Sequence, residues 1–83
     1  MDKWEIRSRP NRLERRFEFD SYDKTRDFLD RLGSHSEARN RFPDISFGKH
    51  YVNITLRPLI DDQEAQLQDE DYQLTKEIDE LID

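Results

Sequence analysis

The feature that most constrains the fold is a strict alternation of apolar and polar residues in the segment Tyr51–Leu56. Val52, Ile54 and Leu56 point to one side of an extended chain, and the intervening residues point to the other. Branched and aromatic side chains favour strands. This segment is therefore predicted to be a strand with one buried face, and residues 13–19 show the same alternation.

Two other segments have the apolar spacing of helices. The first runs from about residue 22 to residue 40, and its predicted inward positions are Phe28, Leu29, Leu32 and Ser36. Gly33 lies within it and is expected to mark a close approach to the sheet. The second helix begins at residue 69 after a polar loop, and its predicted apolar face consists of Leu74, Ile78, Leu81 and Ile82.

Short alternating segments at residues 4–6 and 45–47 complete the order strand, strand, helix, strand, strand, helix. Strands joined by short turns pair antiparallel, so we predict an α+β fold with a four-stranded antiparallel sheet and helices on one face. Residues 1–83 form a single predicted domain, because a chain of 83 residues cannot fill a second core. The core is small, so we expect a homodimer that pairs through an edge strand such as Tyr51–Leu56.

Composition excludes several classes of protein. The absence of cysteine excludes disulfides, thiolate metal sites and a cysteine nucleophile. No apolar run approaches the ~20 residues that span a bilayer, and residues 1–5 show no secretory signal. We therefore expect a cytoplasmic protein without a membrane partner.

The distribution of charge argues against nucleic acid as a partner. The net charge is −6, and residues 60–83 contain ten acidic side chains and one base. Phosphate binding needs clustered Lys and Arg. The arginine-rich segment at residues 7–16 is interpreted as a solvated strand-and-turn surface.

The sequence contains no motif for a cofactor or a metal. Gly33 and Gly48 are the only glycines, so no phosphate-binding loop is present. His35 and His50 lack the paired spacing of zinc ligands. We expect neither a cofactor nor a metal ion.

Several local strings recur in the order and at the distances of one known family. They are Trp4, Phe17-Glu18-Phe19-Asp20-Ser21-Tyr22, Phe28, Pro43, Val52-Asn53-Ile54-Thr55-Leu56, Leu67, Asp71 and Leu74. Together they span nearly the whole chain and resemble the pterin-4a-carbinolamine dehydratase family. The resemblance implies the dehydratase-like fold described above.

The family's active site contains a Glu-x-x-x-His-His-Pro string, which here reads Glu37-Ala38-Arg39-Asn40-Arg41-Phe42-Pro43. A Tyr-Asn pair falls on Lys49-His50, a Thr-His pair falls on Pro58-Leu59, and the Asp of the last helix remains as Asp71. The residues at the three expected histidine positions are therefore Arg41, Phe42 and Leu59.

These replacements bear directly on catalysis, because dehydration of a carbinolamine needs groups that exchange protons near neutral pH. Arginine stays protonated, and Phe and Leu transfer no protons. The resemblance therefore implies a pseudoenzyme with no catalytic residue. The alternative is a divergent pterin dehydratase that retains Glu37, Pro43 and Asp71 and uses His50, expected next to the site.

A member of this family without its histidines resembles the dehydratase-like RuBisCO assembly factors associated with alpha-carboxysomes. That resemblance implies an assembly chaperone whose partner is the RuBisCO large subunit. The former pocket, reshaped by Arg41, Phe42, Lys49 and Leu59, becomes a candidate protein-contact surface. Phe42 would then be either an interface anchor or a core residue that fills the vacated pocket. The acidic last helix would meet a basic patch on the client.

Overall fold

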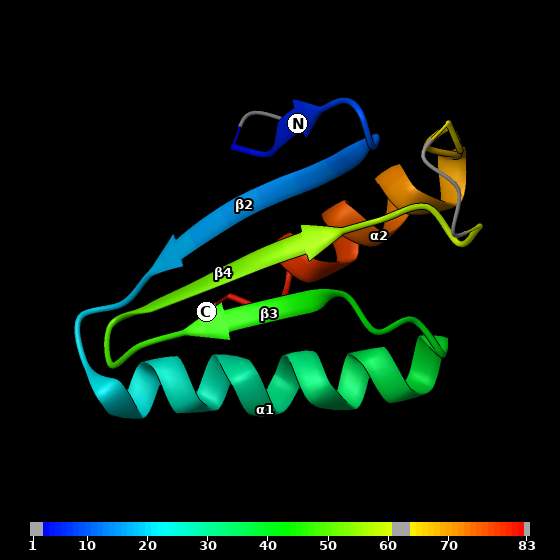
Figure 1. The fold of residues 1–83 in the computed structure, drawn as a ribbon. Helices are drawn as coiled ribbons and strands as arrows, with labels where there is room; N and C mark the ends of the chain where they lie inside the picture. Colours follow the sequence, from blue (N-terminus) through cyan, green and yellow to red (C-terminus); the bar gives the residue numbers. More distant parts are fainter. Residues whose placement is uncertain (1–2, 61–63, 83) are drawn as a thin grey trace.

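The computed structural model of the protein describes residues 3–60 and 64–82, so residues 61–63 of the predicted loop lie outside the described residues. The elements are β1 (Glu5–Arg7), β2 (Arg12–Glu18), α1 (Tyr22–Arg39), β3 (Asp44–Phe47), β4 (Tyr51–Leu56) and α2 (Asp69–Asp79). Figure 1 shows the two helices beside one twisted sheet. The predicted α+β fold, with its order β-β-α-β-β-α, is confirmed.

The sheet has the strand order β1-β2-β4-β3, and each neighbouring pair is antiparallel. Strand β4 is therefore a central strand, and the expectation that Tyr51–Leu56 forms an edge is wrong. Its alternation of apolar and polar residues reports a buried face, and says nothing about whether one or both of its edges are paired. Strand β3 forms one outer edge, and β1 forms the other (Figure 1).

The core lies on one face of the sheet. Pairing of β2 with β4 sets Leu13 opposite Leu56 and Phe17 opposite Val52. The helices cover this face with a set of buried apolar side chains, which are Phe28, Leu32, Leu74 and Ile78. Burial of about ten large apolar residues supplies the main stabilising free energy, at roughly 1.5–3 kcal/mol for each side chain.

Two details of the helices differ from the predictions. Gly33 is exposed, and a Cβ placed there would meet nothing within 4 Å, so the expected close packing on the sheet is wrong. Helix α2 ends at Asp79, before Leu81 and Ile82. Leu81 still packs against the core. The chain turns after α2, and this turn keeps Leu81 on the apolar side although it lies outside the helix.

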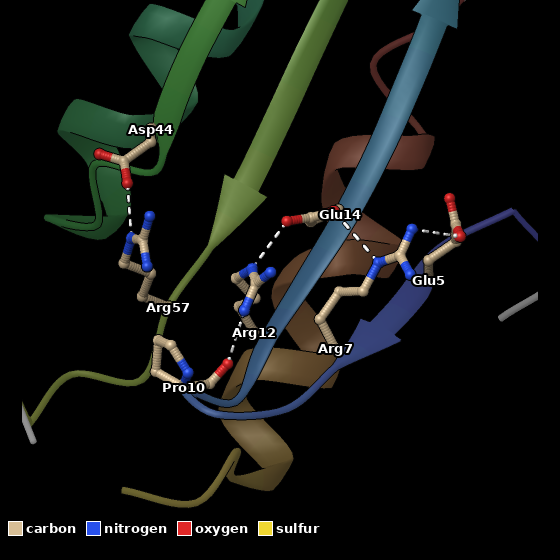
Figure 2. Close-up of polar contacts among 7 residues, drawn as sticks. All are labelled: Glu5, Arg7, Pro10, Arg12, Glu14, Asp44 and Arg57. Carbon is tan, nitrogen blue, oxygen red and sulfur yellow. Dashed lines mark hydrogen bonds and ion pairs between the residues drawn. The ribbon is translucent and has the colours of Figure 1, made fainter. Parts of the chain in front are cut away.

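The opposite face of the sheet carries charged side chains (Figure 2). Arg7 pairs with Glu5 at 2.9 Å, and Arg12 donates from Nε to Glu14 at 2.7 Å. The hydrogen bond from Arg12 holds the pKa of the Glu14 carboxyl below its ordinary value. This part of the arginine-rich segment is therefore a solvated surface of ion pairs.

Candidate functional site

The end of α1 determines where Arg41 lies. Asn40 adopts a left-handed conformation with φ 55°, which asparagine tolerates better than most residues. The backbone N–H of Arg41 then donates to the carbonyl of Ser36 at 3.1 Å, and the N–H of Asn40 donates to Glu37 at 3.3 Å. This cap reverses the chain and directs Arg41 toward the end of β4 and the start of α2.

Asp71 is the residue of α2 that pairs with Arg41. It lies in the first turn of the helix and is 1% exposed. One carboxylate oxygen accepts the backbone N–H of Gln68 at 2.8 Å, and the other accepts Nη2 of Arg41 at 2.7 Å. The positive end of the helix dipole favours this carboxylate. Asp71 therefore completes the cap of α2 and neutralises the Arg41 guanidinium.

The Arg41–Asp71 ion pair joins three parts of the chain. The Arg41 side chain is 12% exposed and also donates to the carbonyl of Arg57, just after β4, at 3.2 Å. The exit from α1, the exit from β4 and the start of α2 are thus connected through one side chain. Such a buried pair holds its surroundings in place, because removal of either partner leaves the other charge uncompensated.

A hollow of about 290 Å³ lies beside this ion pair. Its lining includes four of the predicted site residues, namely Arg41, Phe42, Pro43 and Leu59. The three residues at the expected histidine positions therefore share one hollow. Phe42 is 67% exposed and Leu59 is 62% exposed, so the alternative that Phe42 fills the pocket as a core residue is wrong.

Four predicted site residues do not line this hollow, and one of them, Asp71, is the ion-pair partner of Arg41. Glu37 is exposed in the last turn of α1. Lys49 and His50 lie in the β3–β4 turn, where Thr25 donates to the Lys49 carbonyl at 2.8 Å and Nδ1 of His50 is 3.2 Å from the carbonyl oxygen of Phe19. Strand β4 separates this turn from the hollow by about 20 Å. The expected position of His50 next to the site is therefore wrong, as is that of Lys49.

Sequence reasoning missed Ile60, which was assigned to a polar loop. It is 72% exposed and lines a second hollow of about 190 Å³ together with Pro58, Leu59 and Ala65. Pro58 and Leu59 line both hollows, so the two are neighbours that share these residues. We refer to the exposed side chains of Phe42, Leu59 and Ile60 as the apolar rim. The sequence did contain a signal for this surface, namely Pro58 followed by two branched apolar residues, Leu59 and Ile60.

The charged side chains that line the two hollows are those of Arg41, Asp44, Arg57 and Glu70. The described lining contains no histidine, and His35 instead pairs with Glu77 at 2.8 Å between the two helices. Arg57 is held by Asp44 at 2.6 Å at the rim of the first hollow (Figure 2). Within residues 3–60 and 64–82, no three His, Asp or Glu side chains gather as metal ligands. In the same residues, neither helix has the length and apolar character needed to cross a membrane.

Comparison with known proteins assigns the chain to one family. Residues 1–81 match the family described as pterin 4 alpha carbinolamine dehydratase, and the chain belongs to that family. A putative pterin-4-alpha-carbinolamine dehydratase from Methylococcus capsulatus (strain ATCC 33009 / NCIMB 11132 / Bath) is 27% identical over 79 residues, which cover 95% of this chain and 67% of the relative.

Two solved structures match with a TM-score of 0.84. One is a pterin dehydratase-like protein identified as a RuBisCO assembly factor in the alpha-carboxysome. It is 38% identical, and the match covers 95% of this chain and 88% of that one. The other is a transcriptional coactivator/pterin dehydratase from Brucella melitensis, 14% identical, with coverage of 100% and 85%. At that identity the second match shows the fold alone.

Replacement of Arg41 tests the structural role of the ion pair. Arg41→Met should lower the free energy of unfolding by about 3–5 kcal/mol, because Asp71 would remain as a buried, uncompensated carboxylate. Arg57→Met is the matched control, since its pair with Asp44 is exposed and should contribute at most about 1 kcal/mol. Urea unfolding followed by circular dichroism measures both.

The double variant Arg41→Met/Asp71→Asn should recover part of the lost stability, because no buried charge is left unpaired. Equal effects of Arg41→Met and Arg57→Met, or additive losses in the double variant, would contradict the role assigned to the ion pair.

Proposed function

We propose that this protein is a non-catalytic member of its family and acts as a RuBisCO assembly factor in the cytoplasm, in association with alpha-carboxysomes. One observation carries the proposal: the 38% identity over 95% of the chain to a pterin dehydratase-like protein identified as such a factor. The partner is the RuBisCO large subunit. Neither a cofactor nor a metal ion takes part.

The chemistry of the first hollow supports a function without catalysis. General acid–base catalysis needs a positioned group that both gives and takes a proton. Arg41 and Asp71, the two polar groups at the old site, are joined at 2.7 Å. The other residues at histidine positions, Phe42 and Leu59, transfer no proton. Binding of a protein is a function that such a surface can still perform.

The alternative, a divergent pterin dehydratase, rests on Glu37, Pro43 and Asp71. The carboxylate of Asp71 is engaged by Arg41 and by the backbone of Gln68. Glu37 does not line the hollow, and His50 lies at the other end of β4. The positions of these residues thus favour the assembly factor over the enzyme.

Co-expression of this protein with the large and small subunits of RuBisCO tests the proposal. The yield of assembled holoenzyme, measured by native gel and carboxylase activity, should rise when the protein is present, because a partner that binds an assembly intermediate protects its apolar surface from aggregation. An empty vector is the control. An unchanged yield would refute the proposed function.

We also propose that the protein is a homodimer paired through β3. This strand is an outer edge of the sheet, and unpaired edges readily accept another strand. Ile45 and Phe47 lie opposite the core residues Ile54 and Val52, yet they are 40% and 54% exposed. A second copy placed against this edge would bury both side chains.

Light scattering at micromolar concentration should give the mass of a dimer for the unmodified protein and of a monomer for Phe47→Lys, because a charge on β3 disfavours edge pairing. Ile6→Lys is the matched control. Ile6 lies on the same face of the opposite edge and is 60% exposed, so this variant should remain dimeric. A monomeric unmodified protein would contradict the proposal.

A further inference from the structure

We infer that the apolar rim and the two hollows beside it bind a client segment that carries large apolar side chains flanked by lysine or arginine. This inference rests on the proposed function and specifies the surface and the chemistry of the contact. It assigns the contact to Leu59, Ile60 and Glu70 at the start of α2.

The apolar part of the surface is larger than the old site. Phe42, Leu59 and Ile60 are each more than 60% exposed, and none belongs to the core. Two hollows of about 290 Å³ and 190 Å³ meet at Pro58 and Leu59. Contiguous exposed apolar surface with a polar border is typical of protein contact sites. A segment that places one side chain in each hollow would desolvate all three rim residues.

The polar groups beneath and beside the rim favour a cationic occupant. Arg41 is neutralised by Asp71, and Arg57 is paired with Asp44. Glu70 lines the second hollow and is exposed, and within the described residues no ion pair is recorded for it. Asp69 lies beside it in the first turn of α2. The later acids of the helix are compensated, because Asp71 pairs with Arg41, Glu77 with His35 and Arg39, and Asp79 with Arg15. An acidic ligand would meet this field unfavourably, and a basic one would be attracted to it.

A second copy of the chain is a less suitable occupant of this surface. The apolar residues that would join two copies are Ile45 and Phe47 of β3, and neither lines the two hollows. We therefore assign this surface to the client.

An array of overlapping 15-residue peptides from the RuBisCO large subunit, probed with fluorescently labelled full-length protein, tests the inference. The bound peptides should combine large apolar residues with lysine or arginine. Ile60→Asp should weaken their binding about tenfold or more, as expected when a charge replaces an apolar anchor. Glu70→Lys should weaken it too, and most strongly at low salt.

Ile6→Asp is the matched control, because Ile6 is 60% exposed but lines neither hollow, and this variant should bind as the unmodified protein does. Thermal melts of all variants establish that they fold. The inference is overturned if the bound peptides are acidic, if Ile60→Asp binds normally, or if no peptide binds.

Co-expression with RuBisCO separates this inference from the function on which it rests. If the unmodified protein and Ile60→Asp raise the holoenzyme yield equally, the assigned surface is wrong and the proposed function stands. If the unmodified protein leaves the yield unchanged, the proposed function fails, whatever the peptides show. If only Ile60→Asp fails to raise the yield while Ile6→Asp succeeds, both are supported.

Discussion

A buried ion pair, Arg41 with Asp71, determines the chemistry available at this site. The two side chains are 12% and 1% exposed, so both are largely shielded from bulk water and each depends on the other for compensation. The pair connects the end of α1, the end of β4 and the first turn of α2. Arg41, which stands at an expected histidine position, is therefore held in a neutral contact with Asp71.

This neutral contact changes which part of the surface is available to partners. With Arg41 drawn inward to Asp71, the next residue, Phe42, lies at the surface beside Leu59. The site then has a polar, compensated floor and an apolar border, which suits contact with another protein more than it suits proton transfer. The scaffold of the family is retained, and we propose that its use has changed from catalysis to binding.

The sequence predicts the elements well and their arrangement less completely. Alternation at residues 51–56 identified β4. Apolar spacing contains no information about strand order, so the central position of β4 came only from its pairing with both β2 and β3.

The shared hollow of Arg41, Phe42 and Leu59 followed from the family's motifs. The partner of Arg41 did not, because Asp71 is 30 residues away. His50 was misplaced because β3 runs from residue 44, next to the hollow, to the β3–β4 turn, and so carries the chain away from the hollow. Ile60 was missed because exposure in a loop depends on tertiary packing.

We propose that the compensated Arg41–Asp71 pair leaves this hollow without an acid–base catalyst. Stopped-flow measurement of the dehydration of a pterin carbinolamine by the purified protein tests it most directly. We expect a rate equal to that of the uncatalysed reaction at every protein concentration. A rate that rises with protein concentration, and that Asp71→Asn abolishes in a folded variant, would contradict it.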